Sequence, residues 1–348
     1  EVQRRLDKDT TLISYFVTPE KTLAFIITQN SFDLETLSVK NSELKNYITW
    51  FRSFDDLSEA SPASLTQLYA WLIKPLEKYL TTCKVGIVPH GVLHYLPFSA
   101  LTNGSRYLGD RVELYTLPSA SVIPFINEEK RGGDRLLALS QREAEGLPLL
   151  EYADGEALSI AQLYGTKPLL TPSATKSKFR EQAADYDILH LAAHGQLDPN
   201  SPLFSHIFLA PEKPDRDDDG QLNVSEVYEM NLSKANLVVL SACDTQLGAK
   251  SKGDDIVGLS RAFIYAGTPS IIASLWTIED ETTSQLMLSF YTHLKSGMSK
   301  GAALQAAQRE MRAKRPHPYY WAAFVLTGAP GPSCPSASES PDRPALNR

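Results

Sequence analysis

Two stretches, DILHLAAHG at residues 187–195 and LVVLSACDTQLG at residues 237–248, decide the fold class. Each opens with a continuous apolar run of strand length, and the runs end at His194-Gly195 and at Cys243-Asp244. Continuous apolar strands that alternate with amphipathic helices are typical of a mostly parallel sheet covered by helices on both faces. In such a sheet the carboxyl ends of neighbouring strands share one edge, where ligand chemistry collects. We therefore expect the imidazole and the thiol to face each other across a cleft.

The chain outside these two stretches shows the same alternation after residue 134. Further strands are expected at Arg135–Ser140, His206–Ala210, Ser270–Trp276 and Trp321–Thr327. Helical spacing of apolar residues predicts helices over about 153–164, 175–184, 256–266, 281–295 and 299–314. These elements complete the predicted α/β core.

The region before residue 130 has a mixed α and β pattern. A hairpin is expected at 11–18 and 22–29, an amphipathic helix bent at Pro75 over 65–80, and strands at Val85–Val88 and Leu93–Phe98. The polar, glycine-rich segment 127–134 suggests a boundary. We divide the chain into an accessory α/β half (1–130), a catalytic core (131–330) and a disordered tail rich in Pro and Ser (331–348).

Composition excludes several functional classes. The 348 residues carry a net charge of −7, which argues against nucleic acid as the main partner, and no apolar run approaches the length of a membrane span. Three cysteines in a chain of this length argue against a disulfide scaffold and favour a reducing compartment, the cytoplasm. Cys83 is interpreted as a core residue and Cys334 as part of the tail. The start at Glu1, without an initiator Met, suggests a piece of a longer protein.

The two strand ends together supply the groups that a cysteine-based catalytic site needs. A thiol is a weak nucleophile at its ordinary pKa of about 8.5 and needs a base or a stabilised thiolate, which a nearby histidine supplies. The backbone N–H groups of Gly195 and Cys243 can form an oxyanion hole. The alternative for Cys243 is a buried structural cysteine, and the alternative for His194 is a histidine whose ring nitrogens only form hydrogen bonds with the backbone.

The sequence resembles the CHAT domain family, caspase-like cysteine peptidases related to separase and often fused to tetratricopeptide repeats. The resemblance rests on VPHGVLHYLPFSAL (88–101), YTLPSASV (115–122), GLSRAFIYAGTPSIIASLW (258–276), HPYYWAAFVLTG (317–328) and the two stretches above. It implies a caspase-type fold, His194 as general base, Cys243 as nucleophile, and an inactive caspase-like partner in residues 1–130. It also implies a prokaryotic source and an upstream helical-repeat region.

Caspase-like enzymes bind an extended peptide as an added strand, and the strand end at Ser274 and Trp276 is a candidate for that edge. In separase a similar Leu-Trp run precedes an acidic residue that pairs with a basic P1 side chain. By that resemblance Asp280 is expected to supply the S1 carboxylate, with Asp244 as the second candidate. The alternative for Asp280 is a favourable charge at a helix N-terminus.

Residues 215–226, DRDDDGQLNVSE, match the spacing of a calcium loop. Asp215, Asp217 and Asp219 would supply oxygen ligands, and Glu226 would close the site. Pro211 and Pro214 exclude a helix directly before the loop, so a solvated acidic loop is the alternative. No cofactor is required by the predicted chemistry.

We therefore expect a cytoplasmic cysteine endopeptidase that cleaves a protein or peptide substrate and is regulated by the upstream region. The alternatives are a non-catalytic caspase-like scaffold and a small-molecule hydrolase on the same fold. The chain has neither a glycine-rich phosphate loop nor a zinc-ligand pattern, which makes the hydrolase the weaker of the two.

Overall fold

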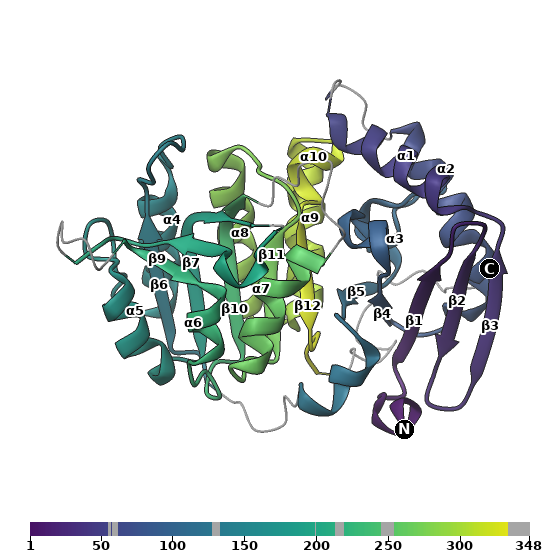
Figure 1. The fold of residues 1–348 in the computed structure, drawn as a ribbon, viewed down its shortest axis with the longest axis horizontal. Coiled ribbons are helices and arrows are strands. Elements are labelled where there is room, and N and C mark those ends of the chain that lie inside the picture. The colour runs from purple at the N-terminus through teal and green to yellow at the C-terminus, as the bar shows by residue number, and fades with distance from the viewer. Residues whose placement is uncertain are drawn as a thin grey trace.

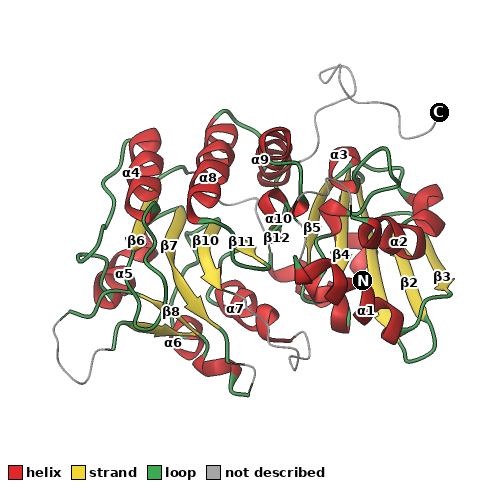
Figure 2. Ribbon diagram, turned by 90° about the horizontal axis from the view of Figure 1, so that it is seen from above, coloured by secondary structure: helices red, strands yellow, loops and turns green. Residues whose placement is uncertain are grey.

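The computed structural model describes residues 1–54, 57, 62–126, 133–198, 200–212, 219–244 and 254–332. Within these residues one twelve-stranded sheet has helices on both faces (Figures 1 and 2). The strands run in the order β3-β2-β1-β4-β5-β12-β11-β10-β7-β8-β9, and β6 pairs with β7. The pairs β1–β4, β4–β5, β5–β12, β11–β10, β10–β7 and β7–β6 are parallel, whereas β11 and β12 in the middle of the sheet are antiparallel. This confirms the predicted α/β class with a mostly parallel sheet.

The strands are β1 (Thr10–Val17), β2 (Thr22–Ile27), β3 (Phe32–Leu37), β4 (Lys84–Val88), β5 (Glu113–Thr116), β6 (Leu136–Gln141), β7 (Ile188–Gln196), β8 (His206–Phe208), β9 (Gln221–Asn223), β10 (Leu237–Asp244), β11 (Ser270–Ser274) and β12 (Phe324–Gly328). The helices are α1 (Asn41–Ser53), α2 (Ala63–Leu72), α3 (Leu108–Arg111), α4 (Ala153–Tyr164), α5 (Lys176–Gln182), α6 (Val224–Tyr228), α7 (Asp254–Tyr265), α8 (Asp280–Lys295), α9 (Lys300–Lys314) and α10 (Pro318–Trp321).

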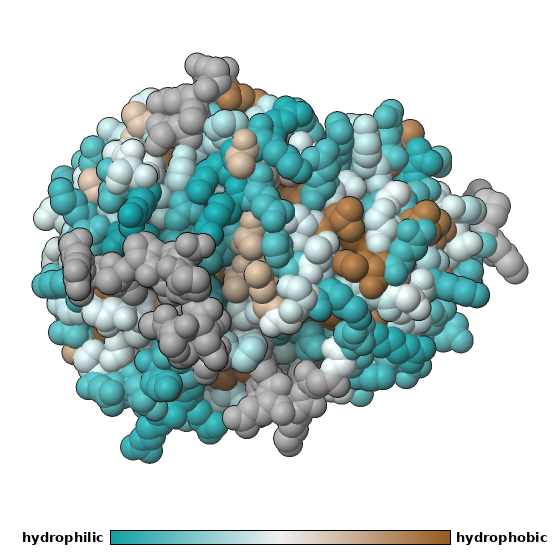
Figure 3. Space-filling model, turned by 180° about the vertical axis from the view of Figure 1, so that it is seen from behind, coloured by the Kyte–Doolittle hydropathy of each residue, from teal (hydrophilic) through white to brown (hydrophobic). Residues whose placement is uncertain are grey.

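The central strands are buried on both faces, which explains their continuous apolar sequences. Successive side chains alternate between the faces, so Val238 and Leu240 enter one apolar cluster and Leu237 and Val239 the other. Helices α4, α8 and α9 lie on one face, and α5, α6 and α7 lie on the opposite face (Figure 2). Figure 3 views the face of α4, α8 and α9 and shows hydrophobic side chains in small separate patches. No helix among the described residues is long and apolar enough to cross a membrane.

The predicted elements of the first 130 residues are confirmed except for one. The hairpin is β1–β2, and the predicted helix over 65–80 ends as α2 before Pro75, followed by a 3-10 segment at Lys74–Tyr79. The strand expected at Leu93–Phe98 is wrong. Leu93–Tyr95 end one 3-10 turn and Phe98 begins another, because Gly91 adopts a left-handed φ of 58° and Pro97 interrupts any ladder.

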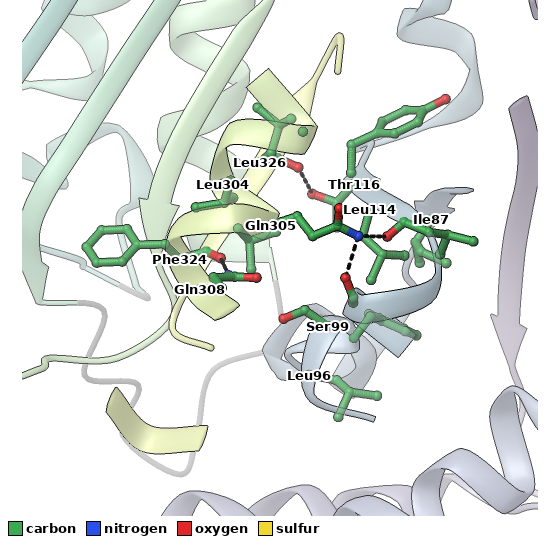
Figure 4. Close-up of a pocket in the computed structure, with 16 residues that line it drawn as sticks. Ile87, Leu96, Ser99, Leu114, Thr116, Leu304, Gln305, Gln308, Phe324 and Leu326 are labelled. Carbon is green, nitrogen blue, oxygen red and sulfur yellow. Dashed lines mark hydrogen bonds between the residues drawn. The ribbon is translucent and has the colours of Figure 1, made fainter. Parts of the chain in front are cut away.

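The sheet continues from the first half of the chain into the second through β5 and β12. Only Thr116 and Thr327 pair across this junction among the described residues. Side chains reinforce the junction: Thr116 Oγ1 donates to the carbonyl of Leu326, and Gln305 Nε2 donates to the carbonyls of Gly109 and Val112 (Figure 4). A cavity of about 40 Å³ lies between these side chains, lined by Leu96, Leu304 and Phe324 among others (Figure 4). The proposed division near residue 130 stays a prediction.

Cys83 differs from its interpretation as a core residue. It is half-buried, its Sγ lies 3.7 Å from the carbonyl oxygen of Asp9, and it is disulfide-bonded. The interpretation of Cys83 as a core residue is therefore wrong, whereas the expectation that the chain has no disulfide scaffold stays a prediction. Nearly all of the predicted tail, residues 333–348, lies outside the described residues.

Candidate active site at the ends of β7 and β10

The two strands that end in reactive residues are neighbours in the sheet. β7 and β10 run parallel, with Leu191 opposite Leu240, His194 opposite Ala242 and Gly195 opposite Cys243. From the first of these pairs to the second, β7 advances three residues (Leu191 to His194) and β10 only two (Leu240 to Ala242). β7 therefore contains one extra residue, a β-bulge. Bulges re-aim the residues that follow them. Here the extra residue moves the partner of Cys243 from His194 to Gly195, which has no side chain.

His194 is held by the backbone of the loop between β6 and α4. Its ring is buried, with 5% of its surface exposed, and its Nε2 lies 2.7 Å from the carbonyl oxygen of Pro148. A carbonyl oxygen only accepts hydrogen bonds, so Nε2 carries the proton in the neutral ring. The other ring nitrogen, Nδ1, is then the basic atom. This contact fixes both the tautomer and the tilt of the imidazole.

Hydrogen bonds between its two ends hold the loop that carries Pro148 in place. The N–H of Leu150 donates to the carbonyl of Arg142 at 3.0 Å, and Nε of Arg142 donates back to the carbonyl of Leu150 at 3.2 Å. Arg142 also lies 3.7 Å from the carboxylate of Asp154 in the first turn of α4. These contacts connect both ends of the loop, so the Pro148 carbonyl has a defined position over His194.

Asp280 connects the same loop to α8. Its half-buried carboxylate accepts a hydrogen bond from the N–H of Tyr152 at 2.6 Å. Burial raises the pKa of Asp280, and the negative charge of Glu156 raises it further, while the Tyr152 hydrogen bond and the nearby His194 oppose the rise. The hydrogen bond to Tyr152 connects this carboxylate to the loop whose Pro148 carbonyl contacts His194. Asp280 also stands in the first turn of α8, as the helix-terminus alternative requires.

Two other predicted substrate residues, Ser274 and Trp276, lie at or just beyond the end of β11. Ser274 ends β11 and pairs with Phe324 of β12. Trp276 is buried, its Nε1 donates to the carbonyl of Tyr319 at 3.0 Å, and its ring stands against Phe54. The structure therefore places Trp276 in a packed aromatic cluster beside the end of β11. The side chains of Cys243 and Asp244 lie outside the described part of the chain, although the backbone of both residues belongs to β10.

A model of the CHAT domain matches residues 62–329, more than three quarters of the sequence. The chain belongs to the CHAT domain family. This confirms the resemblance read from the sequence and covers both the strand ends and most of the first half.

Two curated relatives of this CHAT protein come from mammals. Tetratricopeptide repeat protein 28 of Homo sapiens and its counterpart in Mus musculus are each 26% identical over 323 residues. The match takes in 76% of the present chain and 13% of each relative. The association with tetratricopeptide repeat proteins is confirmed. The expected prokaryotic source stays a prediction.

Solved structures share the fold of the CHAT chain at low sequence identity. The separase–securin complex of Saccharomyces cerevisiae aligns with a TM-score of 0.63 and 8% identity, over 94% of this chain and 30% of that one. The complex of the pro- and mature domains of RgpB of Porphyromonas gingivalis aligns with a TM-score of 0.50 and 11% identity, over 83% and 76%. The fold of the CHAT chain is therefore that of caspase-like proteases.

The calcium loop is described only in part. Asp215 and Asp217 lie outside the described residues. Asp219 lies 3.6 Å from Lys176, and Glu226 caps α6 through the N–H of Asn223 and lies 3.1 Å from Arg180. Among the described residues no cluster of metal-ligating side chains occurs. The calcium site stays a prediction.

Sequence reasoning missed the contribution of Pro148 to the site of the CHAT domain. A backbone carbonyl has no residue-type signature, so its only sequence signal is a loop between a strand and a helix that precedes the histidine strand. A second cavity, of about 620 Å³, lies at the amino edge of the sheet, where Ile188 begins β7 and Asn236 precedes β10. It is therefore at the opposite edge from His194.

Proposed function

We propose that this CHAT domain is a cysteine endopeptidase that acts through His194 and Cys243. The observation that carries the proposal is the pairing of β7 with β10, which brings Gly195 opposite Cys243 and leaves His194 next to it. The family and the caspase-like fold support this choice of nucleophile and base.

In the proposed mechanism, Nδ1 of His194 takes the thiol proton of Cys243, because Nε2 already carries the proton donated to Pro148. The thiolate attacks the scissile carbonyl carbon, and the electron pair of the C=O bond moves to its oxygen. The N–H groups of Gly195 and Cys243 stabilise that oxyanion. The imidazolium then protonates the leaving amine, and water hydrolyses the thioester to regenerate the thiol.

Asp280 is proposed to select substrates with Lys or Arg at P1. Its carboxylate retains one oxygen beyond the hydrogen bond to Tyr152, and partial burial strengthens its attraction for a cation. Ser274 and Trp276 are proposed to lie beside the peptide strand, and Asp244 is the second candidate for the P1 contact.

The catalytic step is proposed to depend on a reducing compartment, the cytoplasm, because only the free thiolate reacts. The chain corresponds to 13% of relatives that are named for tetratricopeptide repeats. We propose that a helical-repeat region in the full-length protein is the partner that controls the active site.

The experiment that tests the function is cleavage of a peptide library, followed by labelling with a peptide acyloxymethyl ketone carrying the preferred P1 residue. Cys243→Ala and His194→Ala are each expected to abolish cleavage while the protein stays folded. Labelling is expected at Cys243 in the wild type. Retained cleavage in either variant would overturn the His194–Cys243 mechanism. A folded wild type that neither cleaves nor is labelled would favour the scaffold alternative.

A further inference from the structure

Four buried polar side chains lie beneath the predicted dyad, on the face of the sheet covered by α4 and α8. They come from four different elements: Glu156 of α4, His190 of β7, Ser241 of β10 and Tyr291 of α8. His190 and Tyr291 are 0% exposed, and Glu156 and Ser241 are each 2% exposed. Burying polar groups is costly unless they satisfy one another, so the contacts within this cluster determine its structure.

One carboxylate oxygen joins the two strands. The hydroxyl of Ser241 donates to Oε1 of Glu156 in a short hydrogen bond, and Nε2 of His190 lies 2.9 Å from the same oxygen. The second approach is too bent for a well-formed hydrogen bond and acts as a close electrostatic contact. Glu156 thus contacts the strand of His194 and the strand of Cys243 at once.

Tyr291 contacts the other ring nitrogen of His190. Burial raises the pKa of Tyr291 well above its ordinary value, so the phenol keeps its proton. Its hydroxyl lies 3.2 Å from Nδ1 of His190. Because Nε2 faces a carboxylate oxygen of Glu156, which only accepts, the proton of the neutral ring is on Nε2 and the Tyr291 hydroxyl donates to Nδ1.

The cluster coincides with the interruption of the ladder between the two strands. Val239 pairs with His190 in regular register, and the register shifts between Leu240 and Ala242, so the bulge of β7 lies opposite Ser241. Backbone pairing is disrupted at a bulge, so it fixes the strands poorly there. The hydrogen bond from Ser241 to Glu156 provides the missing constraint. Ser241 lies two residues before Cys243, roughly 7 Å along the strand.

We propose that Glu156, together with Ser241 and His190, is a positioning cluster that sets the separation of the His194 and Cys243 backbones. None of these side chains touches the reacting atoms; they act through the strand ends. The inference rests on the proposed function, since it assumes that His194 and Cys243 work as a pair. It predicts that the thiolate of Cys243 loses its stabilisation by His194 when the cluster is opened.

The test measures how fast iodoacetamide alkylates Cys243 in the chain as it stands, at pH values between 5 and 10. Mass spectrometry of the peptide that contains Cys243 monitors the reaction. In the wild type we expect a midpoint below about 8.5, and in His194→Ala a higher midpoint. Ser241→Ala is expected to lower the rate at pH 7 about tenfold and to move the midpoint toward that of His194→Ala. Ser241→Thr keeps the hydroxyl and is expected to restore the wild-type profile.

Ser270→Ala is the matched control. Ser270 is also a fully buried serine on a neighbouring strand, and its hydroxyl contacts the carbonyl of Ala329 and Nζ of Lys300 at the far edge of the sheet. It is expected to lower the melting temperature without moving the Cys243 profile. Should Ser241→Ala not fold, Glu156→Gln, which preserves shape and one acceptor oxygen, replaces it.

The outcomes separate the two proposals. An unchanged profile in the folded Ser241→Ala variant, or an equal shift in Ser270→Ala, overturns the positioning role and leaves the dyad standing. Identical profiles for wild type and His194→Ala overturn the dyad itself, and the positioning role with it.

Discussion

The Nε2 atom of His194 and the carbonyl oxygen of Pro148 lie 2.7 Å apart although 46 residues separate them in the sequence. The contact determines which nitrogen of the proposed base is protonated. We therefore expect NMR of ¹⁵N-histidine-labelled protein at a pH where the ring is neutral to find the proton of His194 on Nε2. The half-buried His293, whose Nε2 lies 2.8 Å from Glu310, provides a comparison in the same spectrum. A proton on Nδ1 of His194 would contradict the proposed direction of proton transfer.

Asp280→Asn is expected to lower activity and raise stability. The asparagine oxygen can still accept from the N–H of Tyr152, but the negative charge is lost, so cleavage after Lys or Arg should fall relative to cleavage after neutral residues. Because the pKa of Asp280 is raised on folding, its ionised form destabilises the folded state, and the penalty disappears as the pH falls through that pKa. We expect a higher melting temperature than the wild type at pH 7 and a smaller difference at acidic pH.

Glu281→Gln is the control for this prediction. Glu281 is an exposed residue in the same turn of α8, and its removal changes the net charge by the same amount. It should leave both the P1 preference and the melting temperature near their wild-type values. An unchanged P1 preference in Asp280→Asn would remove Asp280 from the substrate pocket and leave Asp244 as the candidate.

Lys176→Met is expected to strengthen calcium binding at 215–226, if the loop binds calcium as predicted. Lys176 lies 3.6 Å from Asp219 and 3.4 Å from Glu226, so its ammonium competes with a cation for both carboxylates. Isothermal titration calorimetry of the wild type and the variant measures this effect. Absence of heat in both proteins would end the calcium prediction.

Gln305→Leu is expected to destabilise the junction of β5 and β12. The substitution leaves the carbonyls of Gly109 and Val112 without this donor, at a cost of about 1–3 kcal/mol in the free energy of unfolding. Urea denaturation measures the loss. Gln285→Leu on α8 is the matched control, because Gln285 is exposed and donates only to Glu281 among the contacts described for it. Equal stability of the two variants would show that the Gln305 hydrogen bonds contribute little.

Local periodicity was sufficient for most of the fold. The helix expected at 153–164 is α4 to the residue. The strands that lead to His194 and Cys243 were found because their apolar runs are long, although β7 continues to Gln196 and β10 to Asp244, past the expected ends. β3 was missed because its alternating pattern, FDLETL, contains two acidic residues that are poor strand formers. β5 was missed because four residues are too few for a periodic signal.

The site itself was predictable only where residue type carries the chemistry. His194 and Cys243 follow from their positions at strand ends. The bulge in β7, the Pro148 carbonyl and the Glu156 carboxylate do not, because each depends on how a loop or helix packs against the sheet. Glu156 in particular reads as an ordinary polar residue of an amphipathic helix, and only the contacts with Ser241 and His190 show why it is buried.

The sheet that joins the two halves of the chain has a mechanically weak seam. Strands β4 and β5 share four paired positions and β10 and β11 share three, whereas β5 and β12 share one. When force is applied perpendicular to the strands, we expect the sheet to separate first between the two strands that share the fewest paired residues. A pull on the first half of the chain would therefore separate it from β12 before the strands that hold His194 and Cys243 lose their register.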